Sequence, residues 1–278
     1  MRPVITLLTD FGVESTYPAQ MKGVILERCP EAQIVDLTHG VPRHDVRTAA
    51  FALASAVQAF AAGTIHVAVV DPQVGSSRRI LAARIGGSAY LAPDNGLLSV
   101  VLGAGRREAD RRPPDRLIAV QNAALFRRPV SSTFHGRDIF APVAAELALG
   151  RPMEELGPPA DTYQPFDVPT PTRQGDTLAG EVLYVDSFGN LVTNIPARLI
   201  EGEDRAALQT GVAGAVIRGL CASYSDVHAG MLLVYVGSAG FLEVAVNRQS
   251  AAGRLGSGVG TPVRVRLGAA GPPGKPAR

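Results

Sequence analysis

The first 71 residues alternate between short apolar runs and segments with helical spacing, and this alternation restricts the fold more than any other feature of the chain. The spacing predicts helices over 18–29 and 45–60, the second capped by Asp45. Three apolar runs rich in β-branched residues predict buried strands: VITLLT (4–9), QIVDLT (33–38) and GTIHVAVVD (63–71). This order favours an α/β fold, with a Rossmann-like, mostly parallel sheet and helices on both faces.

The pattern changes near residue 157, where a proline-rich stretch has little apolar periodicity. Before it, a helix is predicted after His135, and further strands are predicted over 80–85, 89–96 and 116–121. After it, short strands between Gly and Asp turns predict a smaller antiparallel barrel or sandwich: 180–195, 214–221, 232–237, 241–246 and 261–267. We therefore divide the chain into four parts: an α/β domain (1–160), a linker (161–177), a β domain (178–268) and a disordered tail (269–278).

The composition excludes several classes of function. A net charge of +2, no tryptophan and 5% aromatic residues argue against nucleic acid as a partner. Cys29 and Cys221 are too few for a disulfide framework or a zinc cage, and the histidine spacing supports no metal site. The sequence shows neither a signal peptide nor 18 uninterrupted apolar residues, so we expect a cytoplasmic protein without a membrane partner.

Acidic residues stand at or near the ends of the first three predicted strands. Asp10 and Asp71 directly follow a strand, and Asp36 lies near the end of another. The carboxyl ends of strands in such a sheet are where ligands bind. Each aspartate alone is equally well explained as a helix cap or a turn former.

Two turns near these strands carry further candidates. The stretch DPQVGSSRR, which begins at Asp71, offers Arg78 and Arg79, and either can reach back to the carboxylate. The alternative is a surface salt bridge, which contributes little stability. The turn PDNG can present Asp94 and Asn95 to a bound substrate, or can serve only as a tight turn.

Two other polar motifs are candidates for binding or catalysis. In VDSFGNLVTN, a predicted hairpin brings together Asp186, Phe188 and Asn190, which suits a flat heteroaromatic ligand as well as plain hairpin chemistry. In FHGRD, His135 precedes a predicted helix. It is either a base that faces a substrate or a residue that caps the helix against Asp138.

Seven motifs in order across both halves of the chain carry a resemblance. They are TDFG, MKG, DLTH, VVDPQVGSSRR, APDNGLL, STFHGRDIFAPVAA and VDSFGNLVTNI. Together they resemble the S-adenosylmethionine hydroxide adenosyltransferase family, also called S-adenosylmethionine hydrolases, whose relatives are fluorinase and chlorinase. The resemblance implies an α/β domain and a C-terminal β-barrel, and a homotrimer with sites between subunits. It implies hydrolysis of S-adenosylmethionine to adenosine and methionine, with no cofactor besides the substrate.

The resemblance also implies roles for individual residues. It places the family's Asp–Arg–His triad on Asp71, Arg78 and His135, which would aim a water or hydroxide at ribose C5′. It implies substrate contacts in both domains. In the first domain, Asp10 would bind the ribose hydroxyls. In the second, Asp186 would bind the methionine amino group, Phe188 and Asn190 would contact the adenosine, and the further contacts are Tyr224, Tyr235 and Ser238.

The sequence departs from the halogenases at several of these positions. Halogenases carry an arginine where this chain has Ala239, a tyrosine and a serine at His135 and Gly136, and a tyrosine at Asp71. A halide needs no base, so the triad favours water as the nucleophile. Two alternatives stay open from the sequence: a halogenase that forms 5′-halo-adenosine, and a protein that binds adenosine or S-adenosylmethionine without turnover.

Overall fold

The computed structural model describes residues 2–103 and 113–268, and they form two compact units, Met1–Asp167 and Val168–Arg278. Residues 162–166 of the predicted linker are hydrogen-bonded to the first unit, whereas Thr172–Gln174 form strand β7 of the second. The bounds of the linker stay a prediction. The predicted tail, 269–278, lies outside the described residues.

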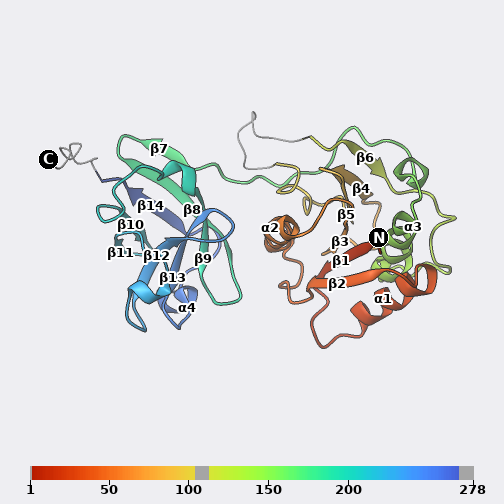
Figure 1. Ribbon diagram of the computed structural model, residues 1–278, viewed down its shortest axis with the longest axis horizontal. Coiled ribbons are helices and arrows are strands. Elements are labelled where there is room, and N and C mark those ends of the chain that lie inside the picture. The colour runs from red at the N-terminus through yellow and green to blue at the C-terminus, as the bar shows by residue number, and fades with distance from the viewer. Residues whose placement is uncertain (1, 104–112, 269–278) are drawn as a thin grey trace. The chain divides into compact units, whose positions relative to one another are not determined.

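The first unit is built on a six-stranded mixed sheet (Figure 1). The strands β2, β1, β3 and β5 pair in parallel, and β4 pairs antiparallel with β5 and β6. Gly86 and Gly87 join β4 to β5 with positive φ values of 56° and 83°, and so tight a connection forces an antiparallel hairpin. The bounds are β1 Val4–Thr9, β2 Gln33–Thr38, β3 Ile65–Val69, β4 Ile80–Ile85, β5 Ser88–Pro93 and β6 Arg116–Ala119.

Helices cover both faces of this sheet, as predicted. On one face, Ile5 and Leu7 of β1 belong to the core that α1 (Tyr17–Arg28) and α3 (Ala141–Ala148) complete. On the other face, Leu8 packs in the core of α2 (Val46–Ala56). Successive side chains of a strand point to opposite faces, so one apolar strand supplies both cores.

Helix α2 is shorter than predicted. Asp45 caps it, accepting from the Thr48 N–H at 2.9 Å, but the α-helix ends at Ala56 and a 3₁₀ turn over Val57–Ala59 follows. The Asp45 cap therefore predicts the start of the helix correctly, whereas the alanine-rich composition does not predict its end. Helix ends commonly tighten into 3₁₀ turns.

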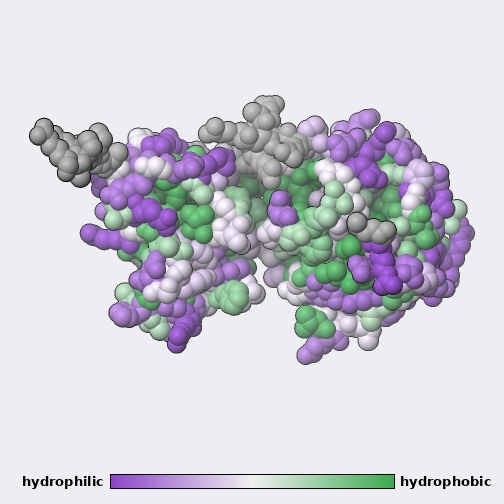
Figure 2. Space-filling view, in the orientation of Figure 1, coloured by the Kyte–Doolittle hydropathy of each residue, from purple (hydrophilic) through white to green (hydrophobic). Residues whose placement is uncertain are grey.

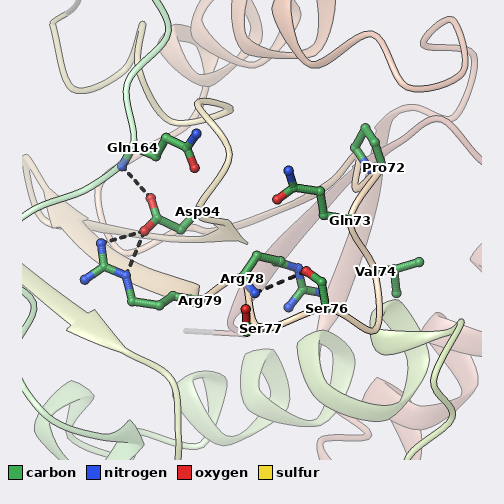
Figure 3. A pocket seen from close by; sticks show the side chains of 9 residues that line it. All are labelled: Pro72, Gln73, Val74, Ser76, Ser77, Arg78, Arg79, Asp94 and Gln164. Atoms are coloured by element: carbon green, nitrogen blue, oxygen red, sulfur yellow. Dashed lines mark hydrogen bonds and ion pairs between the residues drawn. The ribbon is translucent and has the colours of Figure 1, made fainter.

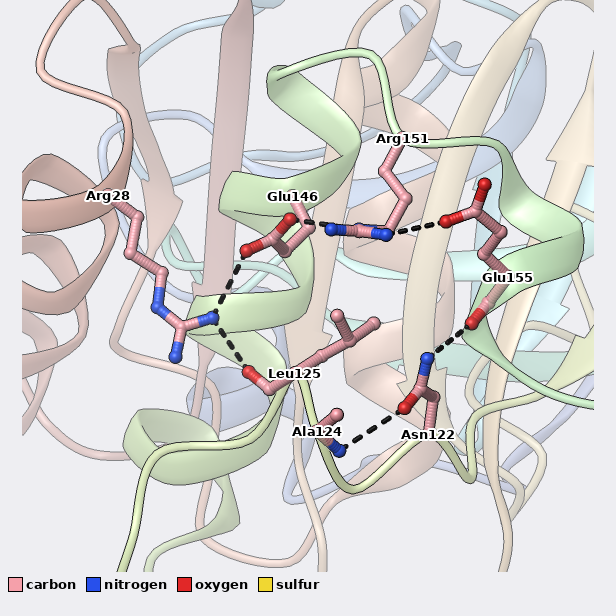
Figure 4. Close-up of polar contacts among 7 residues, drawn as sticks. All are labelled: Arg28, Asn122, Ala124, Leu125, Glu146, Arg151 and Glu155. Carbon is pink, nitrogen blue, oxygen red and sulfur yellow. Dashed lines mark hydrogen bonds and ion pairs between the residues drawn. The ribbon is translucent and has the colours of Figure 1, made fainter.

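A chain of ion pairs ties α1 and α3 to the 3₁₀ turn η4 (Met153–Leu156) (Figure 4). Glu146 of α3 accepts from Arg28 at 3.3 Å and from Arg151 at 2.9 Å, and Arg151 also reaches Glu155 at 2.5 Å. Arg28 further donates to the Leu125 carbonyl oxygen at 2.7 Å. A network of this kind holds these helical elements together better than isolated surface pairs do.

The second unit is an eight-stranded antiparallel sheet curled into a nearly closed barrel (Figure 1). Its strand order is β11-β10-β14-β8-β9-β13-β12, and β7 pairs with β8. Beside the two edge strands, the Cys221 N–H donates to the Val234 carbonyl oxygen at 2.8 Å. The remaining bounds are β8 Thr177–Val185, β9 Leu191–Pro196, β10 Gln209–Val212, β11 Ala215–Arg218, β12 Leu232–Val236, β13 Phe241–Val246 and β14 Pro262–Arg266.

This barrel also contains a short helix that was not predicted from the sequence. The short helix α4 (Ala251–Leu255) begins after Ser250, whose hydroxyl accepts from the Gly253 N–H at 3.0 Å, and ends at the left-handed Gly256. Only short strands between turns were predicted for this part of the chain, so the helix corrects that prediction. The Ser cap and the Gly stop were recognisable signals of a helix.

The surface of both units is mixed in character. On the face shown in Figure 2, hydrophilic side chains alternate with apolar ones over each unit. Among the large apolar side chains of the described residues, Val13 and Phe188 are the most exposed, at 79% and 77%. None of the helices in the described part of the chain has the length and apolar character needed to cross a bilayer.

A buried histidine in the first sheet should make folding stability sensitive to acid. His66 lies between Thr6 and Tyr90 in one row across β1, β3 and β5, with its Nδ1 2.8 Å from the Thr6 hydroxyl. Burial lowers the pKa of His66 to about 4. Its neutral form is therefore favoured by folding, and stability should fall by up to about 3 kcal/mol as pH drops from 6.5 through 4.

Urea unfolding at several pH values checks this expectation. His66→Asn removes the titrating ring, so the free energy of unfolding of the variant should depend less steeply on pH between 6.5 and 4. A variant with the parental slope over this interval would show that other groups cause the acid sensitivity.

Candidate active site

Three predicted residues from separate elements meet in the first unit. Arg78 donates from Nε to Asp71 Oδ2 at 2.7 Å, and its Nη2 contacts the same oxygen. The same Nη2 lies 2.7 Å from Nδ1 of His135. The side chains of Arg78 and Asp71 are 5% and 4% exposed, so this is a nearly buried, connected chain of polar groups.

The contact with Arg78 determines the tautomer of His135. A guanidinium can only donate, so Nδ1 must accept and the proton of the neutral ring sits on Nε2. Burial, and then the charge of Arg78, lower the pKa of His135, although Asp71 and Asp138 oppose the shift. The ring is therefore neutral at pH 7 and can donate from Nε2.

The turn that carries Arg78 is packed against the segment before His135. Gly75 has φ +82°, and a Cβ at this position would lie 2.4 Å from the Ser132 carbonyl oxygen. Only glycine combines this backbone conformation with so close an approach. His135 itself precedes a π-helical turn over Gly136–Phe140, a type of distortion that is frequent at functional sites.

Asp138 holds this segment in place and does not cap His135. It is fully buried and accepts from Arg137 at 2.7 Å and from the Ser131 N–H at 2.8 Å. Burial alone would raise the pKa of Asp138, but these hydrogen bonds and the charges of Arg137 and Arg127 lower it overall. His135 makes no capping hydrogen bond. The capping alternative for His135 is therefore wrong.

Asp10 is oriented by a strained turn. Its Oδ2 accepts from the backbone N–H of His44 at 2.8 Å, and His44 has φ 66°, an uncommon value for a residue other than glycine. Asp36 lies inside β2 and pairs with Lys22 at 2.5 Å and with His39 at 3.0 Å. His39 in turn contacts the Thr9 hydroxyl at 2.9 Å, directly beside Asp10.

The side chains of Asp94 and Asn95 form hydrogen bonds with other residues of the protein. Asp94 accepts from Arg79 at 2.8 Å and from the Gln164 N–H at 2.6 Å, and Asn95 donates to the Val70 carbonyl oxygen at 2.8 Å. The role of Asp94 and Asn95 as substrate contacts stays a prediction. Figure 3 shows Arg78 and Arg79 pointing in different directions, so only Arg78 reaches Asp71.

Asp94 and Gln164 nevertheless line an open cavity together with the turn that carries Arg78 (Figure 3). The cavity measures about 690 Å³. Its other lining side chains come from 72–79. A polar space of this size therefore borders one member of the connected triad.

The second unit brings most of its predicted residues together as well. Nδ2 of Asn190 donates to Asp186 and to the Tyr224 hydroxyl, both at 2.8 Å. The Tyr224 and Tyr235 hydroxyls are 2.8 Å apart. A cavity of about 400 Å³ is lined by Asn190, Tyr224 and the exposed ring of Phe188.

One residue of this cluster was missed by the sequence analysis. Glu243, only 7% exposed, accepts a short hydrogen bond from the Tyr235 hydroxyl. The single acidic residue in the apolar strand FLEVAV was a signal that could have identified it. Ser238 lies exposed in the turn between β12 and β13. Within 2–103 and 113–268, no cluster of three His, Cys, Asp or Glu side chains could hold a metal ion.

Comparison with known protein families decides the identity of this two-unit chain. Residues 5–157 match the SAM hydroxide adenosyltransferase N-terminal domain, and residues 180–264 match the C-terminal domain of the same name. The chain belongs to the SAM hydroxide adenosyltransferase family. The seven sequence motifs predicted this membership, and the comparison confirms it.

Curated relatives of this SAM hydroxide adenosyltransferase family member include hydrolases and, at lower identity, fluorinases. An (R)-S-adenosyl-L-methionine hydrolase of Thermus thermophilus is 42% identical over 95% of this chain and 100% of the relative. One of Salinispora arenicola is 40% identical over 96% and 98%. A fluorinase of Actinoplanes sp. is 29% identical over 88% and 91%.

Solved structures agree with this membership. An uncharacterised conserved protein from Thermotoga maritima is 36% identical, with a TM-score of 0.86 over 94% of this chain and 99% of the other. A conserved hypothetical protein from Thermus thermophilus is 38% identical, with a TM-score of 0.74 over 96% and 100%. The predicted α/β fold with a C-terminal β unit is thus shared with both of these solved structures.

Proposed function

We propose that this enzyme hydrolyses S-adenosyl-L-methionine to adenosine and methionine. A water oxygen attacks ribose C5′ in line with the sulfonium, the C5′–O bond forms as the C5′–S bond breaks, and sulfur keeps the bonding electron pair. One proton leaves the water. The single observation that carries the proposal is the hydrogen-bonded chain of Asp71, Arg78 and His135, in a family member whose relatives at 34–42% identity are named hydrolases.

The triad geometry suggests how the water is held. Nη1 of Arg78 and the Nε2–H of His135 are the donors that the triad can offer to a water oxygen. Asp71 Oδ1 accepts one long bond, 3.3 Å from the Gln73 N–H, while Oδ2 is engaged by Arg78. We assign Asp71 Oδ1 as the acceptor of the proton, because Nδ1 of His135 is already occupied. Positioning of this kind can lower a barrier by about 7–11 kcal/mol.

The packing around Gly136 supports water over a halide as the nucleophile. A Cβ at Gly136 would lie 3.2 Å from the Met21 sulfur and 3.2 Å from the Phe11 ring. The serine found in halogenases would therefore require Met21 and Phe11 to shift by a few tenths of an ångström. Incubation of the purified protein with S-adenosylmethionine plus chloride or fluoride, followed by chromatography, tests the proposal. We expect adenosine and methionine in equal amounts; 5′-halo-adenosine, or unchanged substrate, would contradict it.

We further propose that the enzyme works in the cytoplasm, without a cofactor, as a homotrimer whose sites are shared between subunits. The separation of the triad and the Asn190 cluster into two units of the chain supports a shared site. Subunit mixing tests it. Arg78→Ala and Asn190→Ala, each impaired alone, should regain part of the parental rate after subunits exchange. A mixture no faster than the average of the two variants would contradict the shared site.

The acid limb of the pH–rate profile should report His135. The lowered pKa of His135 keeps the ring neutral until the pH falls below the ordinary histidine value of 6.5. Protonation then removes the acceptor of Arg78 and places two positive charges side by side. The rate should therefore be flat near neutrality and fall at a pH below 6.5. The check is kcat/KM from pH 5 to 8, and an acid limb centred above 6.5 would contradict this assignment.

A further inference from the structure

A relay of hydrogen bonds in the second unit starts at Asp186. Asp186 Oδ1 accepts from two backbone N–H groups of its own hairpin, those of Phe188 at 2.9 Å and Asn190 at 2.8 Å. Its Oδ2 accepts from the Asn190 side chain. The relay then passes through Tyr224 and Tyr235. It ends on a second carboxylate, in a part of the barrel that the sequence analysis did not implicate.

The direction of every bond in this relay follows from Asp186. A carboxylate accepts, so the Asn190 amide must turn its Nδ2 toward it, and the second N–H of Nδ2 goes to Tyr224. The Tyr224 oxygen is then an acceptor, so its own proton points to Tyr235. Tyr235 in turn donates to Glu243. Glu243 is the terminal acceptor that this arrangement requires.

Among the contacts of the described residues, this direction leaves one group of the Asn190 amide available to a ligand. Both N–H groups of Nδ2 are used, so the amide offers its carbonyl Oδ1, which can only accept. Asn190 lines the cavity of about 400 Å³ beside the exposed ring of Phe188. A flat ring that stacks on Phe188 therefore meets an acceptor at Asn190 and gains from carrying an amino group there.

The barrel is built to hold Glu243 at the end of this relay. Glu243 of β13 stands directly opposite Tyr235 of β12 in the antiparallel register. A Cβ at Gly237 would lie 1.7 Å from a Glu243 carboxylate oxygen, so any larger residue there displaces the carboxylate. Its immediate neighbours Leu242 and Val244 belong to the apolar core, which leaves Glu243 on the opposite face of β13, where Tyr235 and Tyr224 lie.

We infer that Glu243 is a positioning residue that, through Tyr235 and Tyr224, acts together with Asp186 to hold the Asn190 amide, so that the site selects a 6-aminopurine over a 6-oxopurine. This inference rests on the proposed function, because it takes the purine of S-adenosylmethionine as the ligand. A 6-oxo group would turn an acceptor toward the Asn190 carbonyl and leave two acceptors facing each other. Without Glu243, the two tyrosines can reverse their donors, so Nδ2 of Asn190 loses its second acceptor and only Asp186 still holds the amide.

Binding of adenosine and inosine by the full-length protein tests this inference without requiring turnover. The parent should bind adenosine on the order of 10- to 100-fold more tightly than inosine in calorimetric titrations. Glu243→Leu removes the terminal acceptor and Tyr235→Phe removes its donor, so each should reduce this ratio at least fivefold. The double variant should reduce it no further, since both changes break the same relay. Glu243→Gln keeps an acceptor oxygen and should retain part of the ratio.

A matched control separates the relay from general loosening of the barrel. Thr193, buried on the neighbouring β9, donates to the Leu242 carbonyl oxygen at 2.7 Å and takes no part in the relay. Thr193→Val should lower the melting temperature while leaving the adenosine to inosine ratio unchanged. An unchanged ratio in folded Glu243→Leu and Tyr235→Phe, or an additive effect in the double variant, would overturn the inference. The proposed function fails separately, when the parent releases no adenosine from S-adenosylmethionine.

Discussion

Arg78→Ala should lower the rate of adenosine release by about 10²–10³-fold, the loss typical for removal of one preorganised donor. Arg78 is the only link between Asp71 and His135 in the described contacts, so its loss frees both side chains. KM should change far less than kcat, because the ribose and purine contacts remain. Steady-state kinetics with S-adenosylmethionine measures both quantities.

Two further variants make this expectation specific. Arg78→Lys keeps the positive charge but cannot contact Asp71 and His135 at once in a planar fork, so it should recover less than a tenth of the lost rate. Arg79→Ala removes the neighbouring arginine, which pairs with Asp94, and should retain kcat within about threefold. Equal losses in Arg78→Ala and Arg79→Ala would mean that the whole turn, and not the triad, is required.

Phe140→Ala should destabilise the first unit by about 3–5 kcal/mol. Phe140 is the largest of the fully buried side chains and ends the π-helical turn that begins beside His135. Its loss leaves a cavity next to α3, and the turn that presents His135 should loosen with it. Urea unfolding gives the change in the free energy of unfolding, and residual activity at low temperature gives the effect on the site.

Phe188→Ala is the matched aromatic control and should affect substrate binding rather than stability. Its ring is 77% exposed, so the free energy of unfolding should change by less than about 0.5 kcal/mol. The same ring lines the cavity of the second unit, so KM for S-adenosylmethionine should rise about fivefold or more. A large loss of stability in Phe188→Ala, or none in Phe140→Ala, would contradict this division of roles.

Much of the fold could be predicted because the periodicity of the sequence matches the burial of its strands. The runs at Val4–Thr9 and Ile65–Val69 are buried almost throughout, as central parallel strands require. The antiparallel pairing of β4 was not predicted, because it depends on the tight Gly86-Gly87 turn and not on apolar periodicity. The four-residue strand β10 (Gln209–Val212) was missed since it is short and carries only one strongly apolar residue.

The candidate site was predictable only in part. Asp71, Arg78 and His135 were identified by their motifs, and the structure brings them together, although their catalytic roles stay predictions. Local sequence could not show that Asp94 is engaged by Gln164, 70 positions away. It could not show either that the hairpin near Asn190 is braced by Glu243. Both depend on contacts between residues far apart in the chain.

The most direct test of the central claim is to follow the oxygen atom itself. We would incubate the enzyme with S-adenosylmethionine in water enriched in ¹⁸O and analyse the adenosine by mass spectrometry. An Asp71–Arg78–His135 site that aims a water at C5′ predicts one ¹⁸O atom on the 5′-hydroxyl in the same fraction of adenosine as the fraction of ¹⁸O in the water, and almost no product with Arg78→Ala. Adenosine without the label, or labelled adenosine formed at the parental rate by Arg78→Ala, would contradict the account.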